Sequence, residues 1–364
     1  MKAKPGKLVN SFLVNGVLAL ICLLWTLPTF GLLISSFRDR IDINVSGWWT
    51  VFPHQDWVVV QKITPEAGVD PTKAMTLGGV TATFEQFTQG IEKDGQRFIW
   101  IGNRRIGYLE VQKYQWTANT NFTLENYKQV LSSGEYTATL KDGTKETKTG
   151  DNMFQAFLNS IAVAVPSTVI PIALAALAAY GFSWMKFPGR KMLFALVIGM
   201  LVFPIQIALI PMLRDFVATH TNGTYLAVWM AHTAFGLPLA TFILYAYISE
   251  LPRDILEAAF VDGASHFTIF TRLIIPLSIP ALASFAIFQF LWVWNDYLVA
   301  LIFIGASPTN QLVTQRLAEI VGSRGQDWHL LTAGAFVTMI VPLAVFFSLQ
   351  RYFVRGLLAG SVKG

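Results

Sequence analysis

The residues of this chain that could do chemistry are few, and their spacing does not favour catalysis. The 364 residues include one cysteine, Cys22, so a disulfide within the chain and a metal site built from cysteines are both excluded. Neither a Gly-x-x-x-x-Gly-Lys-Ser/Thr loop nor a Gly-x-Ser-x-Gly elbow is present. We therefore expect no catalytic residue, no metal site and no cofactor bound by this chain. The histidines form no His-Glu-x-x-His pair and no cluster at helical spacing: His54, His220, His232, His266 and His329.

Four polar residues lie within or beside long apolar segments and are candidates for lining a solute pathway: Gln206, Gln289, Asn295 and Asp296. A carboxylate at bilayer depth is costly and by default indicates function, so Asp296 could belong to a pathway or a gate. The alternative is that Asp296 lies near the membrane surface and bonds Asn295 or a helix terminus, since its Trp and Tyr neighbours are typical of that interface. Each of the four could equally hold helices together.

A polar loop between two apolar segments, residues 249–277, has the residues of a stiff helical elbow. Pro252 suits the first turn of a helix, and Glu257 near its start complements the helix dipole. Gly263 is a natural end for this helix, and a second short helix leads to Pro276 and the next apolar segment. Such an elbow could transmit a push into that segment. An amphipathic elbow that rests on lipid headgroups is the alternative.

The composition is that of a membrane protein. Apolar residues make up 53% of the chain and charged residues 13%, about half of the usual charged share, and the mean hydropathy is +0.48. A bilayer core about 30 Å thick needs roughly 20 helical residues. The sequence therefore predicts an all-α polytopic bundle of six transmembrane helices, several of them kinked by proline. The predicted spans are Phe12–Ile34, Phe157–Trp184, Met192–Leu213, Tyr225–Ile248, Ser278–Ile304 and Leu330–Leu349.

The first span follows three lysines and could instead be a cleaved signal peptide. Its apolar run is longer than a signal core of about 7–15 residues, and no Ala-x-Ala site follows, so we expect it to be retained. The placement of basic residues predicts that both termini are cytoplasmic, and the net charge of +5 therefore indicates a bilayer rather than nucleic acid. The residues on that side are Lys2, Lys4, Lys7, Lys186, Arg190, Lys191, Arg253, Arg272, Arg351, Arg355 and Lys363.

The long segment between the first two spans, residues 38–150, is predicted to be an external domain. It holds 13 basic and 13 acidic residues, and long segments cross the membrane largely regardless of charge. Runs such as Trp57–Gln61, Val80–Phe84 and Phe98–Ile101 are typical of short strands. We expect a small, mostly β domain; a structured loop on the bundle is the alternative. The chain then divides into 1–37, 38–150 and 151–364.

The spacing within the polar loop resembles a known signature. Glu257-Ala258-Ala259 is followed after three residues by Gly263, and after nine more by Leu273-x-Ile275-Pro276. This order resembles the EAA motif in the permease subunits of bacterial ABC importers, with Leu and Ile exchanged and the proline kept. The stretch at about 39–118 is longer than usual and is similar to that of α-glucoside permeases. Other segments resemble the maltose-type branch of sugar permeases: Phe122–Tyr127, Phe157–Ser160, Asn295–Tyr297, Asp327-Trp328 and Leu358–Gly364.

The resemblance implies a non-catalytic transport subunit of the bacterial inner membrane. In such importers a heterodimer of two permease subunits lines the pathway, two cytoplasmic ATPases use ATP and Mg, and a periplasmic binding protein delivers the sugar. The sugar would be an α-glucoside or an oligosaccharide such as maltose, sucrose or trehalose. Lipid surrounds such a chain, and no nucleic acid is involved. The residues that would couple to the ATPases are Glu257, Ala258, Ala259, Asp262, Gly263 and Pro276.

Two further segments have roles that the resemblance implies. The tail residues Gly360, Lys363 and Gly364 would reach the ATPases, or form a frayed terminus. The loop at 305–328 would face the binding protein, or serve only as a connector. An ion-coupled secondary transporter is the main alternative function, but it would need paired charges in the membrane and usually an internal repeat. A membrane-anchored scaffold would leave five spans and the loop without a purpose.

Overall fold

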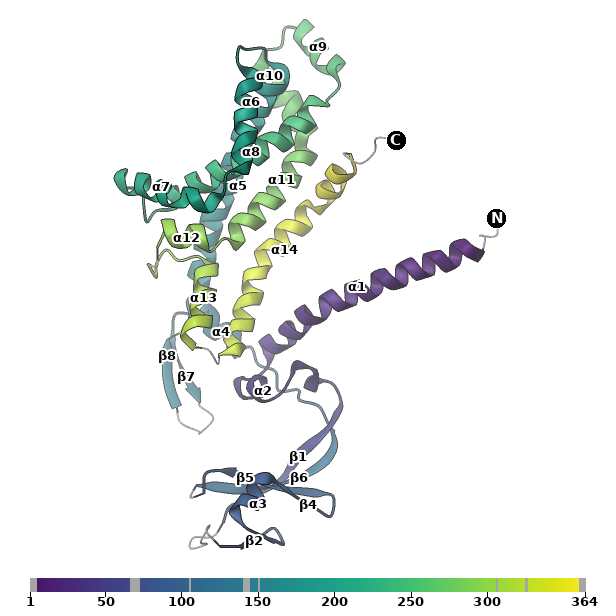
Figure 1. Ribbon diagram of the computed structural model, residues 1–364, viewed down its shortest axis with the longest axis vertical. Helices are drawn as coiled ribbons and strands as arrows, with labels where there is room; N and C mark the ends of the chain where they lie inside the picture. The colour runs from purple at the N-terminus through teal and green to yellow at the C-terminus, as the bar shows by residue number, and fades with distance from the viewer. Residues whose placement is uncertain are drawn as a thin grey trace. The chain divides into compact units, whose positions relative to one another are not determined.

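The computed structural model describes residues 5–65, 73–104, 106–139, 145–149, 151–305, 307–324 and 327–359. Two compact units make up the chain, Met1–Thr123 and Leu124–Gly364 (Figure 1). The boundary therefore lies earlier than the division at Gly150 taken from the sequence. The physical reason is helix α4 (Glu125–Leu131), whose Val130 is fully buried in the helical core of the second unit. The hairpin of β7 (Glu135–Thr139) and β8 (Lys145–Thr149) follows it.

The first unit begins with α1 (Pro5–Phe37), a long apolar helix. It continues into α2 (Arg40–Val45) and a 3-10 turn, η1 (Trp48–Val51). The chain later returns to this place, because the N–H of Thr123 donates to the carbonyl of Phe37 at 2.7 Å and the N–H of Asn119 to that of Thr50 at 2.8 Å. Both ends of the insertion are thus joined at the end of α1.

Between these ends lies a small β domain, which confirms the predicted, mostly β insertion. A four-stranded antiparallel sheet has the order β1-β6-β5-β4, and a hairpin of β2 and β3 accompanies it. Its own hydrophobic core includes Phe87, Phe98, Trp100 and Leu109. The elements are β1 (His54–Ile63), β2 (Met75–Leu77), β3 (Val80–Ala82), α3 (Phe84–Gln89), β4 (Ile91–Lys93), β5 (Gln96–Gly102) and β6 (Gly107–Thr117).

The second unit is a bundle of apolar helices. Five helices of the described chain are long and apolar enough to cross a membrane, or six if one bent pair counts as a span, which confirms the predicted polytopic α class. The elements are α5 (Met153–Trp184), α6 (Arg190–Gly199), η2 (Met200–Val202), α7 (Ile205–Ala218), α8 (Tyr225–Ser249), α9 (Arg253–Val261), α10 (His266–Ile269), η3 (Phe270–Ile274), α11 (Ile275–Asn295), α12 (Leu298–Phe303), α13 (Val313–Arg324) and α14 (Trp328–Ala359).

The third predicted span is not one kinked helix. Arg190–Val202 and Ile205–Ala218 are bent by 103° at Phe203 and Pro204. Pro204 lacks an N–H, and its ring disfavours helical backbone at the preceding residue. Phe203 accordingly has an extended backbone, with φ −76° and ψ 122°. The fifth predicted span is also interrupted, because α11 ends at Asn295 and the short α12 begins at Leu298.

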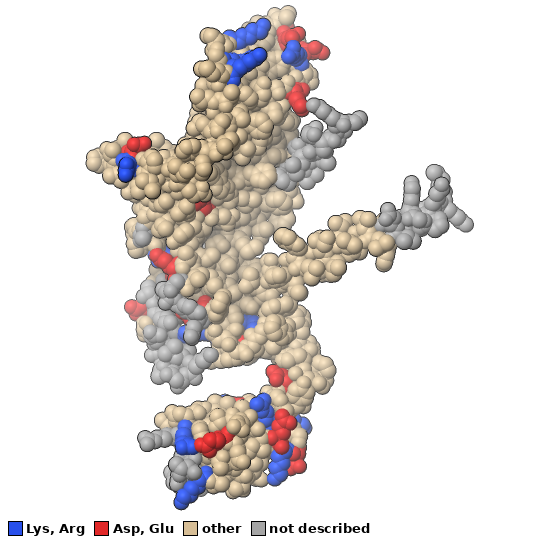
Figure 2. Space-filling model, viewed as in Figure 1, with Lys and Arg blue, Asp and Glu red and all other residues tan. Residues whose placement is uncertain are grey.

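Two hydrophobic clusters hold the bundle together, one toward each end of its long helices. One cluster contains Val163 of α5 and Ala231 of α8, and the other contains Ala176 of α5 and Leu244 of α8. Lys, Arg, Asp and Glu side chains are visible mainly near the ends of the bundle, including the end that holds α9, and the surface between is almost bare of them (Figures 1 and 2). This distribution suits a body whose middle lies in hydrocarbon.

Candidate functional site

The loop between α8 and α11 contains a helix with a defined end. The N–H of Gly263 donates to the carbonyl of Phe260, and that of Ala264 donates to the carbonyl of Ala259, both at 3.0 Å. These two bonds form a Schellman motif, which needs left-handed backbone at the first residue after the helix cap. Gly263 supplies it with φ +78°. The predicted helix end at Gly263 is therefore where the structure places it, one residue after Asp262, which caps α9.

The main anchor of α9 on the bundle is its one fully buried side chain. Leu256 is fully buried in a cluster with Ile248 of α8 and Ile269 of α10. Ala259 is half-buried against the same cluster, whereas Glu257 and Ala258 are exposed and Val261 is 88% exposed. Ile255, Phe260 and Phe267 of the same loop are exposed as well, and several exposed apolar side chains in one short segment are typical of a contact surface for another protein.

The second half of the loop joins the bundle through α5. His266 Nδ1 lies 2.8 Å from the hydroxyl of Tyr180, and the ring of Phe260 packs edge-on against His266 with centroids 5.0 Å apart. The Ser265 hydroxyl caps α10 by accepting from the N–H of Thr268 at 3.2 Å. This geometry ties the end of α9 to the long helix α5, so a displacement of the loop would load both α5 and α11.

The loop enters α11 through one turn of π-helix, Phe270–Ile274. Pro276 follows at the start of α11, where it lacks an N–H and its ring crowds the carbonyl four residues earlier, that of Arg272. We attribute the widened turn to this proline. Pro276 is exposed, so it shapes the backbone rather than the core.

A layer of polar groups separates the two hydrophobic clusters of the bundle. Gln289 of α11 is buried, and its Nε2 donates to the carbonyls of Ser167 on α5, at 3.1 Å, and His232 on α8, at 3.4 Å. The hydroxyl of Ser167 and Nδ1 of His232 have no hydrogen-bond partner among the described residues, although both atoms are buried. Buried polar atoms without a partner are rare in folded proteins, so this layer is an unusual feature of the bundle.

A cavity of about 730 Å³ opens beside this polar layer, between the bent pair α6–α7 and the helices α8 and α11. Its wall is mainly apolar, with residues such as Met200, Phe203 and Trp292, and Gln289 also lines it. Gly236 gives this side chain room, because a Cβ there would lie 2.6 Å from Oε1 of Gln289. The volume is that of a site for a small ligand.

The other three candidate pathway residues do not line this cavity. Gln206 is exposed on α7, and Asn295 is exposed at the end of α11, where its Nδ2 donates to the carbonyl of Leu291 at 2.7 Å. The carboxylate of Asp296 accepts from the N–H of Val299 at 2.9 Å and so caps α12. This contact is the helix-terminus role that stood as the alternative for Asp296. A pathway role for these residues stays a prediction.

Residues 309–313 are hydrogen-bonded to α5 by two polar side chains that were not among the candidate site residues. Nδ2 of Asn159, on α5, donates to the carbonyls of Thr309 and Gln311 at 2.9 and 3.0 Å, and the Ser160 hydroxyl accepts from the N–H of Val313 at 2.9 Å. The signal was present in the sequence as two polar residues early in an apolar helix. The tail residues Gly360, Lys363 and Gly364 lie outside the described residues.

Comparison with known proteins assigns the helical bundle to a protein family. Residues 147–358 match the family described as "Binding-protein-dependent transport system inner membrane component". The chain is 48% identical over 343 residues to the osmoprotective compounds uptake permease protein GgtD of Synechocystis sp., covering 94% of this chain and 89% of that one. It is 46% identical over 383 residues to the alpha-glucoside transport system permease protein AglG of Rhizobium meliloti, covering 95% of each.

Among solved structures, the fold is similar to a chain in the crystal structure of a bacterial ABC transporter that imports the acidic polysaccharide alginate. The TM-score is 0.62 at 14% identity, over 97% of this chain and 99% of that one. At this identity the likeness concerns the fold alone. The family match covers more than half of the chain, and both relatives are similar over nearly its full length. This chain belongs to the inner membrane components of binding-protein-dependent transport systems, as a permease subunit of an ABC importer.

Proposed function

We propose that this chain is one of two permease subunits that carry an α-glucoside, or a related oligosaccharide such as maltose, sucrose or trehalose, into the cytoplasm. The observation that carries this proposal is the 46% identity to an alpha-glucoside permease over 95% of both chains, which includes the insertion. A relative from Thermococcus litoralis, 36% identical over 245 residues, is a trehalose/maltose permease. A periplasmic binding protein would deliver the sugar.

The end of the bundle that holds α9 would face the cytoplasm, with both chain termini on that side. Lys186 lies between α5 and α6, Arg190 and Lys191 begin α6, and Arg253 begins α9, so basic residues gather at this end of the bundle (Figure 2). Basic residues in short loops favour the cytoplasmic side. The polar loop is then within reach of cytoplasmic partners.

The α9 loop would bind a partner ATPase, which would use ATP and Mg. The exposed Val261 and the small residue Ala258 would enter a groove of that ATPase, and Glu257 and Asp262 would contact polar groups at its rim. Leu256 and the His266–Tyr180 contact would carry the displacement into α11 and α5. Gln289 lies 13 residues beyond Pro276, about 20 Å along α11 at 1.5 Å per residue. Helix α11 thus joins the end of the loop to Gln289 in the polar layer.

Alternating access follows if the two arrangements of α11 expose the cavity to opposite sides. Each ligand shifts such an equilibrium only by its difference in affinity for the two states. Bound ATP and the sugar-loaded binding protein would therefore both favour the outward-facing state. Coupling to an ion gradient is disfavoured, because α5, α8 and α11 contain no Asp, Glu, Lys or Arg.

The test is to purify the complete assembly from native membranes and reconstitute it in vesicles. ATP hydrolysis and sugar uptake are measured with candidate binding proteins, each with and without an α-glucoside. We expect co-purified ATPases whose turnover rises with one sugar-loaded binding protein. Isolation as a lone chain, with uptake that follows a proton gradient and ignores ATP, would overturn the proposal.

Docking of the loop has its own test by cross-linking. Cys22 is exposed and is first replaced by serine. A cysteine at Val261, 88% exposed, should then cross-link to the ATPase, whereas a cysteine at Met192, 75% exposed at the start of α6, serves as the matched control. Equal yields at both positions would show that the contact is not specific to α9.

A further inference from the structure

The segment after α1 folds back along the helix that it has just left. We name residues 38–52 the collar. The Trp48 ring lies against Gly31, where an added Cβ would be 2.6 Å from the indole Nε1, and it packs edge-on to Phe30 with centroids 6.1 Å apart. Gly31 and Ser35 of α1 and Arg38 directly after it are buried, although residues 11–30 are exposed. The collar therefore covers the last two turns of α1.

This contact fixes the depth of the collar in the bilayer. The apolar span of α1, Ser11–Phe37, has 27 residues, or about 40 Å at 1.5 Å per residue, about 10 Å more than a hydrocarbon core. Gly31 precedes Phe37 by six residues, about 9 Å. Trp48 thus lies at or below the boundary between hydrocarbon and headgroups, which is where Trp residues concentrate.

The outer surface of the collar is apolar and aromatic. Ile41, Val45, Trp49 and Phe52 are exposed by 47%, 65%, 61% and 48%. Trp49 and Phe52 form a cluster of rings with Trp48, with Trp48–Trp49 and Trp48–Phe52 centroids 6.3 and 6.4 Å apart. In water such a surface would be unfavourable, whereas its position on α1 continues the membrane-facing surface of that helix.

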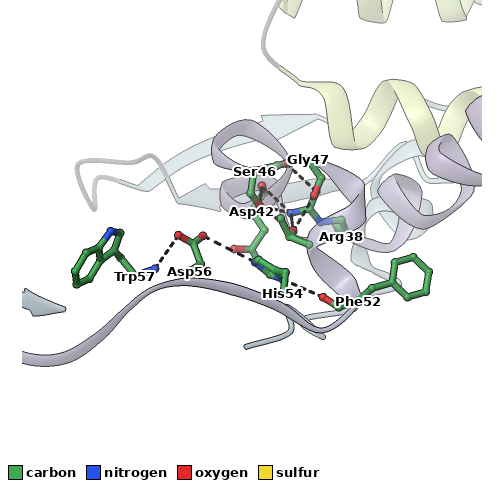
Figure 3. Close-up of polar contacts among 9 residues, drawn as sticks. Arg38, Asp42, Ser46, Gly47, Phe52, His54, Asp56 and Trp57 are labelled. Atoms are coloured by element: carbon green, nitrogen blue, oxygen red, sulfur yellow. Dashed lines mark hydrogen bonds and ion pairs between the residues drawn. The ribbon is translucent and has the colours of Figure 1, made fainter. Parts of the chain in front are cut away.

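Arg38 holds the collar in this folded-back shape. It is 1% exposed, and its guanidinium donates to the carbonyls of Ser46, at 2.9 Å, and Asp42, at 3.0 Å (Figure 3). It also donates to the Thr50 hydroxyl at 3.4 Å. These are the carbonyls at the end of α2, which a cation stabilises. Burial lowers the pKa of Arg38, and the nearby Asp42 opposes that shift.

We propose that the collar is a lipid-binding site that lies in the membrane interface at the end of α1. Its ligands are phospholipids at the level of the glycerol backbone, which contact Ile41, Val45, Trp49 and Phe52. The collar thereby mounts both ends of the β insertion on the bilayer surface at a set height. This role does not depend on which solute the transporter carries.

The test uses the complete transporter in phosphatidylcholine vesicles, with Cys22 replaced by serine. A polarity-sensitive fluorophore is attached to a cysteine at Val45 or, as a control, at Ile106, which is 79% exposed in the β domain. We expect blue-shifted emission at Val45, with quenching by phosphatidylcholine brominated near the carbonyl end of one acyl chain. The emission at Ile106 should stay water-like and unquenched. Water-like emission at Val45 would overturn the proposal. So would a blue shift that brominated lipid does not quench, because a protein would then cover the collar.

A matched pair of substitutions in α1 tests how the collar is held. Gly31→Leu must displace the Trp48 ring, whereas a Cβ added at Gly16 meets no atom within 4 Å, so Gly16→Leu is the matched control. We expect lipid quenching at Val45 to be lost in the Gly31 variant and kept in the Gly16 variant. Full quenching in both variants would overturn the inferred placement of the collar by α1.

Discussion

Gly263 offers the sharpest test of the coupling loop, because its backbone and side-chain requirements can be separated. It has φ +78°, and a Cβ added there would meet no heavy atom within 4 Å. The Cβ of a substituted residue therefore has room, and the main cost of Gly263→Ala is backbone strain. We expect Gly263→Val to leave membrane insertion intact and to abolish or uncouple transport, with Gly263→Ala weaker and Gly263→Asn weakest.

The size of the effect follows from the left-handed conformation. It costs an ordinary L-residue about 1–2 kcal/mol, and less for asparagine. A change of this size alters a ratio of two populations about 5–30-fold. Gly263→Ala should therefore reduce the fraction of loops with an intact Schellman end by up to that factor, and Gly263→Val should exceed it because its β-branched side chain is stiffer.

The assay measures sugar uptake and ATP hydrolysis in the same vesicles, so that coupling is the ratio of the two rates. Gly223 is the matched control, since it has φ +81° and also lacks any atom within 4 Å of an added Cβ, but precedes α8 outside the loop. Gly223→Ala and Gly223→Val carry the same backbone strain. They should lower stability similarly and leave the ratio unchanged.

Two results would refute the reasoning. Normal uptake by Gly263→Val would show that the helix end does not matter for coupling. Equal loss of coupling in the Gly223 series would show that strain anywhere in the bundle, rather than at the loop, is responsible.

Three further predictions concern the bundle. Gly236→Ala should lower sugar uptake without lowering insertion, because its methyl group would displace Gln289 into the cavity; uptake at the level of the parent protein would contradict this. Asn159→Ala removes the donor to two carbonyls of the segment at 305–328 and should reduce stability by about 1–3 kcal/mol, measured as a lower thermal midpoint in detergent. Asp296→Ala should lose a helix cap, about 0.5–2 kcal/mol, whereas Asp296→Asn should keep most of it with normal transport; a transport defect in a stable Asn variant would instead indicate a pathway role.

The polytopic helical class of the protein and the end of α9 followed from local properties of the sequence. Apolar length identifies a spanning helix regardless of its neighbours, and the glycine at 263 ends its helix through a conformation that other residues avoid. The β insertion was also predictable, because short alternating runs between Gly and Asn carry the strand signal within themselves.

The sequence by itself determined which segments enter the membrane and where the elbow lies, since hydropathy, proline and glycine act within a few residues. Tertiary structure alone decided how distant residues meet. It placed Gln289 opposite Ser167 and His232 and fastened Asn159 to a segment about 150 positions away. It also separated Asp296 from the cavity that Gln289 lines. The physical reason is that the long helices α5, α8 and α11 are apolar nearly all round, so their sequences do not reveal which face packs, and only contact with neighbouring helices fixes their rotation.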